Sequence, residues 1–307
     1  MRTTILWRVT IRALRAWWDD NCLRLAASLA FYTALSLAPL VLLVVGLAGL
    51  VIERRQVANQ LAAQLEGLMG PAGRELVNSI LTTTTPQGGT WATVLGLVTL
   101  LIGATAVFGE LQATMNLVWE VQPAPTGGVW AGIWALLKER LFSLALVFAL
   151  AFLLLVSLVI SAALARAAVL FQGPEQTLLS RLLELIVSQL VLTFMFALLF
   201  RYVPDAEVRW REVWRGGGIT AVLFTLGKTA IGYYLGQASV GSAYGAAGSM
   251  VVLLVWVYYS ALIMFFGAEF THAWATRQGA VVPQPHAVAG AVPQTKGEAA
   301  AERTPGA

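Results

Sequence analysis

The sequence predicts an all-α polytopic membrane protein with six transmembrane helices, and composition is the first observation behind that prediction. Hydrophobic residues make up 58% of the 307 positions, whereas charged residues make up only 12%. A soluble domain has about twice that charged fraction, because water must wet its surface. The composition therefore excludes a soluble enzyme, a disordered chain and a collagen-like chain.

Six long apolar segments are the second observation. About 20 apolar residues cross the hydrocarbon core as a helix, and such segments stand out because unpaired backbone groups cannot face lipid. The segments also lack the period-two alternation of a membrane β-barrel. We expect transmembrane helices at about residues 27–52, 91–113, 141–165, 182–203, 216–236 and 246–272.

The remaining segments complete the expected domain organisation. Residues 1–20 predict a basic interfacial helix, because apolar residues and arginines fall on different faces at helical spacing. Residues 53–90 predict two short amphipathic helices in the first outer loop. Residues 275–307 are rich in Ala, Gly, Pro and Gln, and we expect a disordered cytoplasmic tail there. The six-helix membrane domain between them covers residues 21–274.

The distribution of basic residues predicts the orientation. Six spans place both termini on the same side of the membrane, and the segments on that side hold 14 Lys and Arg residues, against five on the other side. Short loops rich in Lys and Arg stay in the cytoplasm. We therefore expect both termini to be cytoplasmic.

Charged side chains within the spans are functional candidates, because a charge is costly to place in lipid. Lys228 lies near the middle of the fifth span, and Glu110 and Glu269 lie near the cytoplasmic ends of the second and sixth. Two interpretations of Lys228 stay open. It faces a polar cavity and pairs with a carboxylate or an anionic substrate, or it forms a structural ion pair or extends to the membrane surface. For Glu110 and Glu269, the position near an interface favours a structural role.

The first span carries a polar stripe and a proline. Ser28, Tyr32 and Ser36 recur every four residues, so they share one helix face, which we expect to turn toward the bundle interior. Pro39 follows them. Proline removes a backbone hydrogen bond and clashes with the preceding turn, so a kink is expected there and Pro39 is a candidate hinge.

The sequence predicts no catalytic, metal-binding or cofactor-binding residues. It contains one cysteine and two histidines, and it lacks the patterns of zinc proteases, serine hydrolases and nucleotide-binding loops. The net charge of +4 comes largely from the cytoplasmic loops. Membrane lipids are therefore the expected partners, an anionic amphiphile is a candidate substrate, and nucleic acid is not expected. The oligomeric state stays open.

Four stretches in the same order carry a resemblance to a known family. They are 26–39 (AASLAFYTALSLAP), 115–121 (MNLVWEV), 201–204 (RYVP) with the glycines at 216–218, and 244–245 (YG) with 256–258 (WVY) and 267–269 (GAE). The chain resembles the YihY/BrkB family of bacterial inner-membrane proteins over about residues 10–275. The resemblance implies a six-helix fold in the bacterial cytoplasmic (inner) membrane. The family has carried the labels "ribonuclease BN" and "virulence factor BrkB", but this sequence lacks the residues that would hold a catalytic metal ion.

Two hypotheses of function follow. The leading one is a transporter or flippase for an amphiphile or envelope precursor, with an anionic headgroup at Lys228. Because no ATP-binding motif occurs, transport would be passive, ion-coupled or driven by a partner. The alternative is a non-transporting scaffold or envelope assembly factor that binds through residues 56–81 and the small-residue turn at 237–248. An RNA-processing enzyme is disfavoured for want of metal ligands.

Overall fold

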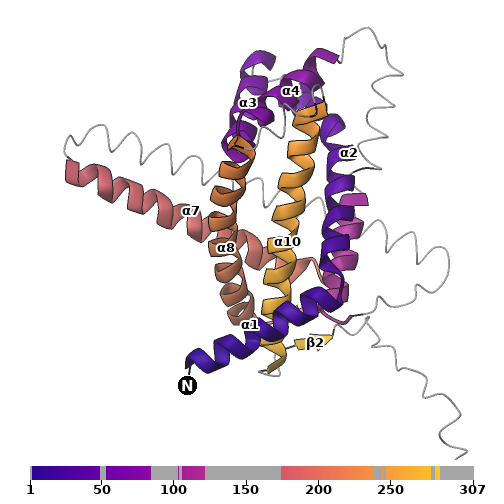
Figure 1. Ribbon diagram of the computed structural model, residues 1–307, viewed down its shortest axis with the longest axis vertical. Coiled ribbons are helices and arrows are strands. Elements are labelled where there is room, and N and C mark those ends of the chain that lie inside the picture. Colours follow the sequence, from indigo (N-terminus) through magenta and orange to yellow (C-terminus); the bar gives the residue numbers. More distant parts are fainter. Residues whose placement is uncertain are drawn as a thin grey trace, which may run out of the picture.

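The computed structural model describes residues 2–48, 53–83, 103, 106–121, 174–237, 244, 247–277 and 281–283. Helices dominate these residues (Figure 1). The named helices are α1 (Arg2–Asp19), α2 (Cys22–Ala48), α3 (Arg54–Met69), α4 (Pro71–Thr83), α7 (Pro174–Tyr202), α8 (Trp210–Gln237) and α10 (Gly248–Arg277). A further helical stretch covers residues 106–118. Two short strands, β1 (Ala206–Val208) and β2 (Val281–Pro283), pair with each other.

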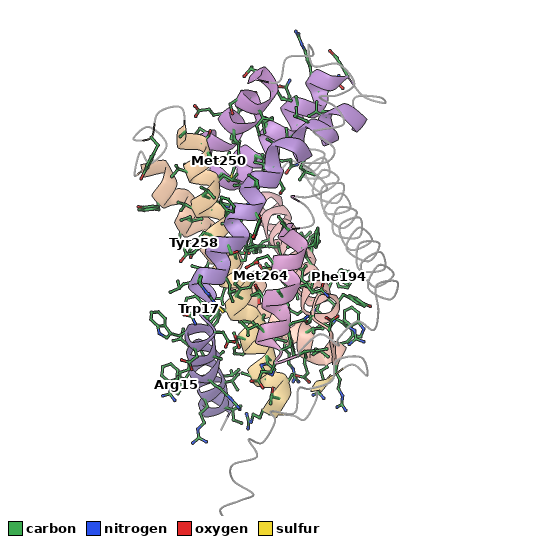
Figure 2. The ribbon with its side chains drawn as sticks, turned by 90° about the vertical axis from the view of Figure 1, so that its right-hand side faces the viewer. Arg15, Trp17, Phe194, Met250, Tyr258 and Met264 are labelled. Atoms are coloured by element: carbon green, nitrogen blue, oxygen red, sulfur yellow. The ribbon has the colours of Figure 1, made fainter. Side chains whose placement is uncertain are left out.

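α10 lies at the centre of the described helices. It packs against both α8 and α2, while α7 crosses α8. α1 lies across one end of α10, and α3 and α4 cover the opposite end (Figure 1). In Figure 2, Met250, Tyr258 and Met264 mark successive levels of α10, and Trp17 and Arg15 of α1 lie toward the end of the molecule where α10 continues past Met264.

Three described helical segments are long and apolar enough to cross a membrane: Cys22–Leu42 of α2, Leu185–Tyr202 of α7 and the whole of α10. They correspond to the first, fourth and sixth predicted spans. α8 occupies the fifth predicted span, but glycines, threonines and Lys228 make it less apolar than the other three. The third predicted span lies outside the described residues, and so does the second apart from residue 103 and residues 106–113.

The C-terminal segment differs from the expectation. A disordered tail was predicted from residue 275, but α10 continues to Arg277 and residues 281–283 form β2. β2 pairs antiparallel with β1, with Ala206 opposite Pro283 and Val208 opposite Val281. The order extends further because the backbone of β2 finds hydrogen-bonding partners in the loop that follows α7. The described fold is therefore helical with one small strand pair, and residues 284–307 lie outside the description.

α2 passes through Pro39 as one continuous helix that ends only at Ala48. The candidate hinge therefore does not interrupt the helix, and a bend at this position stays a prediction. A proline within a helix loses one backbone hydrogen bond, but packing on both sides of it compensates. Ala34 and Leu37 pack with α4 and α10 before the proline, and Val41 and Val45 pack with α3 and α4 after it.

The helices α3 and α4 form a pair within the segment where two short helices were expected. Gly70 separates them with a φ of 74°, a backbone conformation that favours glycine. Arg74 of α4 forms an exposed ion pair with Glu66 of α3 at 2.6 Å. The apolar side of the pair packs onto the bundle, where Met69 and Leu76 contact Val252 and Leu253 of α10.

Glycine and threonine hold α8 and α10 close together. Gly216 of α8 lies directly against the side chain of Thr271 of α10, and Gly267 of α10 lies directly against Thr220 of α8. Each threonine donates its hydroxyl hydrogen bond to the glycine carbonyl one turn earlier on its own helix, at 2.8 Å for Thr220 and 2.6 Å for Thr271. The hydroxyls are therefore satisfied locally, and the two helices interlock through small residues. We call these four residues the Gly–Thr lock.

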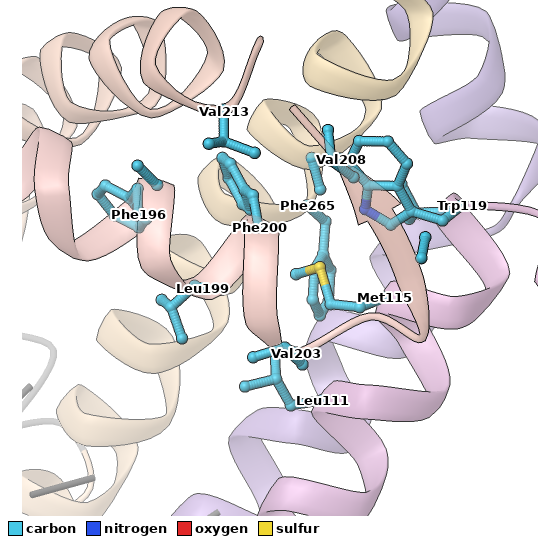
Figure 3. Packing of buried hydrophobic residues seen from close by; sticks show 14 of the residues in the cluster. Leu111, Met115, Trp119, Phe196, Leu199, Phe200, Val203, Val208, Val213 and Phe265 are labelled. Atoms are coloured by element: carbon cyan, nitrogen blue, oxygen red, sulfur yellow. The ribbon is translucent and has the colours of Figure 1, made fainter. Parts of the chain in front are cut away.

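The main hydrophobic cluster joins helices that are far apart in the sequence. Met115 and Trp119 come from the segment after residue 106, Phe200 comes from α7 and Phe265 from α10, and all four are buried. Figure 3 shows these side chains converging, with Val208 of β1 beside Trp119. The cluster fixes the end of α10 that carries Glu269 and the family-like stretch at 115–121.

Candidate functional site

Lys228 is exposed on α8. It lies on the same face of α8 as the residues that pack against α7. Residues seven and four positions earlier share its face. They are Ala221, which is buried, and Phe224, whose ring contacts that of Phe196 on α7 at 5.6 Å between centroids. Among the described residues, no carboxylate lies within ion-pair distance of the Lys228 amine.

The two helices separate close to Lys228. Thr225, three residues before it, donates a hydrogen bond to Oε1 of Gln189 on α7 at 3.0 Å. Toward its N-terminus, α7 then runs away from the other described helices (Figure 1). The residues of α7 that precede Gln189 include exposed apolar side chains: Leu182, Leu183, Leu185 and Ile186. We call Lys228, Thr225, Gln189 and these exposed residues the α7–α8 junction.

The side chain of Gln189 supplies a second hydrogen-bond donor at the junction, and this donor has no acceptor among the described residues. The Gln189 amide nitrogen is buried, and it has no hydrogen-bond partner among the described residues, although Oε1 of the same side chain accepts from Thr225. A buried donor without a partner carries a free-energy cost. The junction therefore presents an ammonium group and an amide N–H that can both donate to an anion.

An apolar groove of about 480 Å³ lies on another side of α8. Its walls come from three helices, with Trp17 on α1, Gly227 and Ala230 on α8, and Tyr259 and Phe266 on α10. The Trp17 indole N–H donates to the backbone carbonyl of Leu262 at 3.3 Å, which attaches α1 to the groove. Lys228 is rotated by roughly 100° from Gly227 around the helix axis, so the amine does not lie on the wall of the groove. The groove suits hydrocarbon.

The polar stripe of the first span is unevenly buried. Ser36 is buried and packs against Gly103, whereas Ser28 and Tyr32 are half-buried. The Ser36 hydroxyl donates to the backbone carbonyl of Thr33 at 3.0 Å, which satisfies it within its own helix. The stripe supports a close helix contact at Ser36, and none of its described contacts is with Lys228.

Glu110 is half-buried, and the polar residues that follow it belong to a structural clamp. Asn116 binds Asp205 through two hydrogen bonds: its amide nitrogen donates to Asp205 Oδ2 at 2.9 Å, and its Oδ1 accepts from the Asp205 backbone N–H at 2.8 Å. Gln112 also donates to the Asp205 carboxylate at 3.4 Å. The clamp joins the stretch at 115–121 to the loop that follows RYVP.

Glu269 is fully buried within the protein near the end of α10, and its depth in the membrane stays a prediction. Only 1% of its surface is exposed, and its carboxyl group faces that of Asp20 in the turn between α1 and α2. Sequence reasoning did not select Asp20, because Asp-Asp-Asn between two helices is typical of a solvated turn. The residue becomes visible only when α1 folds back onto the end of α10.

No group of three or more His, Cys, Asp or Glu residues in the part of the chain that the structure describes can hold a metal ion. The single cysteine, Cys22, is buried as a free thiol at the start of α2.

A family model described as virulence factor BrkB matches residues 13–290 of the chain. The chain belongs to this family. The match covers all four stretches that carried the resemblance, and the BrkB description agrees with the family expected from them. Neither that description nor the names of the relatives state an enzymatic activity.

The curated relatives of this BrkB-family chain are described as UPF0761 membrane proteins. One from Verminephrobacter eiseniae is 33% identical over 277 residues, which cover 86% of this chain and 62% of that protein. Another from Methylibium petroleiphilum is 30% identical over 286 residues, with coverage of 91% and 65%. The chain thus spans less than two thirds of the length of these relatives. No solved structure matches the chain.

Proposed function

We propose that this BrkB-family protein is a transporter or flippase for an anionic amphiphile, and that Lys228 binds the headgroup. It acts in the bacterial cytoplasmic membrane, with six spans and both termini in the cytoplasm. The observation that carries the proposal is the exposed Lys228 amine, midway along a predicted span and without a carboxylate partner among the described residues.

The energetics of a cation at this depth support an anionic ligand. An ammonium group within a bilayer is costly unless it is paired or hydrated. Gln189, beside Thr225 on the neighbouring helix, adds a buried amide N–H without an acceptor. A phosphate or carboxylate headgroup would satisfy both donors, and charge-assisted hydrogen bonds of this kind are stronger than neutral ones.

The apolar surfaces near the junction suit the tail of an amphiphile. Exposed leucine and isoleucine side chains precede Gln189 on α7, so hydrocarbon chains can remain in an apolar environment while the headgroup meets Lys228. An amphiphile thus matches both kinds of surface, whereas a wholly polar solute would match only the donors. Since no ATP-binding motif occurs in the sequence, movement is passive, ion-coupled or driven by a partner.

Translocation in proteoliposomes tests the proposal. The probe is a fluorescent phosphatidylglycerol whose outer-leaflet fraction is measured by quenching. We expect Lys228→Ala to slow translocation about tenfold or more, because losing a hydrogen bond to a charged group costs about 1.5–3 kcal/mol, whereas Lys228→Arg retains most of the rate. Arg211→Ala, which removes an exposed positive charge near the start of the same helix, is the matched control. Equal rates for wild type, Lys228→Ala and Lys228→Arg would end the proposal.

The scaffold alternative receives less support. Its expected binding surface was the amphipathic pair within residues 56–81, but the apolar side of that pair already packs against α2 and α10. The turn at 237–248 lies mostly outside the described residues. A stoichiometric crosslinked partner that is lost on deleting 56–81 would favour the scaffold instead.

A further inference from the structure

The turn between α1 and α2 brings the half-buried Asp20 toward the fully buried Glu269 of α10. Asn21, with a φ of 55°, lies in the turn where the chain changes direction from α1 to α2, and Asp20 beside it faces α10. There the carboxyl group of Asp20 lies within hydrogen-bonding reach of that of Glu269. α1 is held in the same place by apolar contacts, because Val9 and Ala13 pack against Phe270 of α10. The acidic pair is thus part of the contact between α1 and α10.

Glu269 lacks the partners that a buried carboxylate needs. Its Oε1 is buried without a hydrogen-bond partner, and no cation among the described residues forms an ion pair with it. Glu212 differs from Glu269 in this respect. It is buried to a similar extent, but it forms an ion pair with Arg215 at 3.3 Å. An unpaired charge in such a place is strongly unfavourable. Two ionised carboxylates also cannot donate a hydrogen bond to each other, because both are acceptors only.

We propose that Asp20 and Glu269 form a proton-binding site in which one shared proton fastens α1 to the end of α10. A shared proton explains how the two carboxyl groups can lie together. It supplies the hydrogen-bond donor that two carboxylates lack, and it removes one of the two negative charges. A metal ion fits less well, because the described residues contain no group of three ligands. The site is separate from Lys228, so it does not depend on the proposed transport.

Several other titratable or charged groups face the pair. Glu120 adds a further negative charge toward Glu269, and the Cys22 thiol at the start of α2 faces both carboxyl groups. His272 lies one turn after Glu269, with its ring 5.2 Å from that of Trp119. Asp20, Glu120 and Arg12 are the charged groups that face His272. Arg12 is the cation of this set, and it belongs to α1 itself.

Loss of the proton has a structural consequence for α1. Two carboxylates would then repel each other at this contact, and the attachment of α1 to α10 would rest on its apolar contacts and the Trp17 hydrogen bond alone. α1 also supplies Leu14 and Trp17 to one wall of the apolar groove. Deprotonation therefore loosens this wall.

Infrared spectroscopy of the full chain in lipid bilayers at neutral pH detects the proton directly. Wild type should show the carbonyl stretching band of a protonated carboxylic acid, and Glu269→Gln should remove it. Asp20→Asn should keep the band but shift it, because the hydrogen-bonding partner changes. Glu75→Gln, at an exposed position on α4, is the control and should leave the band unchanged. Absence of the band in wild type, or its persistence unchanged in Glu269→Gln, would overturn the proposal.

A second measurement remains informative if Glu269→Gln does not fold. Thermal unfolding of wild type should move to lower temperature as the pH rises and the shared proton is lost. Asp20→Asn removes one of the two ionisable groups, so the same pH change should shift its unfolding temperature less. An equal pH dependence in wild type and Asp20→Asn contradicts a shared proton. Both readouts are independent of lipid translocation, so they fail separately from the proposed transport.

Discussion

The Gly–Thr lock between α8 and α10 makes a sharp prediction about stability. A methyl group added at Gly267 would overlap the side chain of Thr220, and one added at Gly216 would overlap Thr271. Because each threonine is fixed by a hydrogen bond to its own helix, it cannot turn away without losing that bond. Gly267→Ala and Gly216→Ala should therefore force the two helices apart.

The magnitude follows from two opposing effects. Overpacking a tight contact costs about 1–3 kcal/mol, and a displaced threonine hydroxyl adds about 1 kcal/mol for its lost hydrogen bond. In the opposite direction, alanine has a higher helix propensity than glycine, which stabilises the helix by up to about 1 kcal/mol. We expect each variant to lower the free energy of unfolding by about 1–3 kcal/mol. Gly232→Ala is the matched control on α8, since nothing lies within 4 Å of the added methyl group, and it should be neutral or stabilising.

Unfolding in detergent micelles, followed by circular dichroism, measures these differences. Thr220→Ala in the Gly267→Ala background removes the overlapping atoms, so the double variant should recover part of the lost stability. Such a recovery is a coupling between the two positions, as expected for residues in direct contact. If Gly267→Ala proves as stable as Gly232→Ala, or if the double variant shows no coupling, the reasoning about the lock is wrong.

Two further predictions concern polar contacts. Asn116→Ala should lower the free energy of unfolding by about 1.5–3 kcal/mol, because it removes the amide donor to the Asp205 carboxylate and the acceptor of the Asp205 backbone N–H. Asn78→Ala at an exposed position is the comparison, and an equal effect of the two contradicts the clamp. Arg74→Ala should cost at most about 1 kcal/mol, because the ion pair with Glu66 is exposed. High salt should remove most of that difference in the same measurement, whereas a salt-independent loss would point to packing instead.

Much of the helical organisation was predictable from local patterns. Long apolar runs indicated α2, α7 and α10, since the period of the sequence and the thickness of the bilayer suffice for that prediction. The polar periodicity of residues 53–90 indicated helices, and α3 and α4 lie there. The strand pair was not predictable, because three residues on each side acquire their partners only when the loop after α7 meets the segment after α10.

The candidate sites were predictable only in part. Lys228 stood out because a lone charge in an apolar segment is visible in the sequence. The contact between Gln189 and Thr225 near Lys228 depends on how α7 crosses α8, and no local sequence pattern specifies that crossing. Asp20 and Asn116 look like ordinary turn and helix-end residues, and their partners are 249 and 89 positions away, respectively, along the chain.

The sequence by itself indicated a membrane protein, the apolar segments that form α2, α7 and α10, and the family, because hydrophobicity and residue order are local properties of the chain. The tertiary structure decided which polar groups are paired and which are left with a vacant hydrogen bond. Burial and pairing arise from helices that meet across long sequence separations, so Glu269 changes from a helix-end carboxylate into a buried partner of Asp20 only once α1 lies against α10.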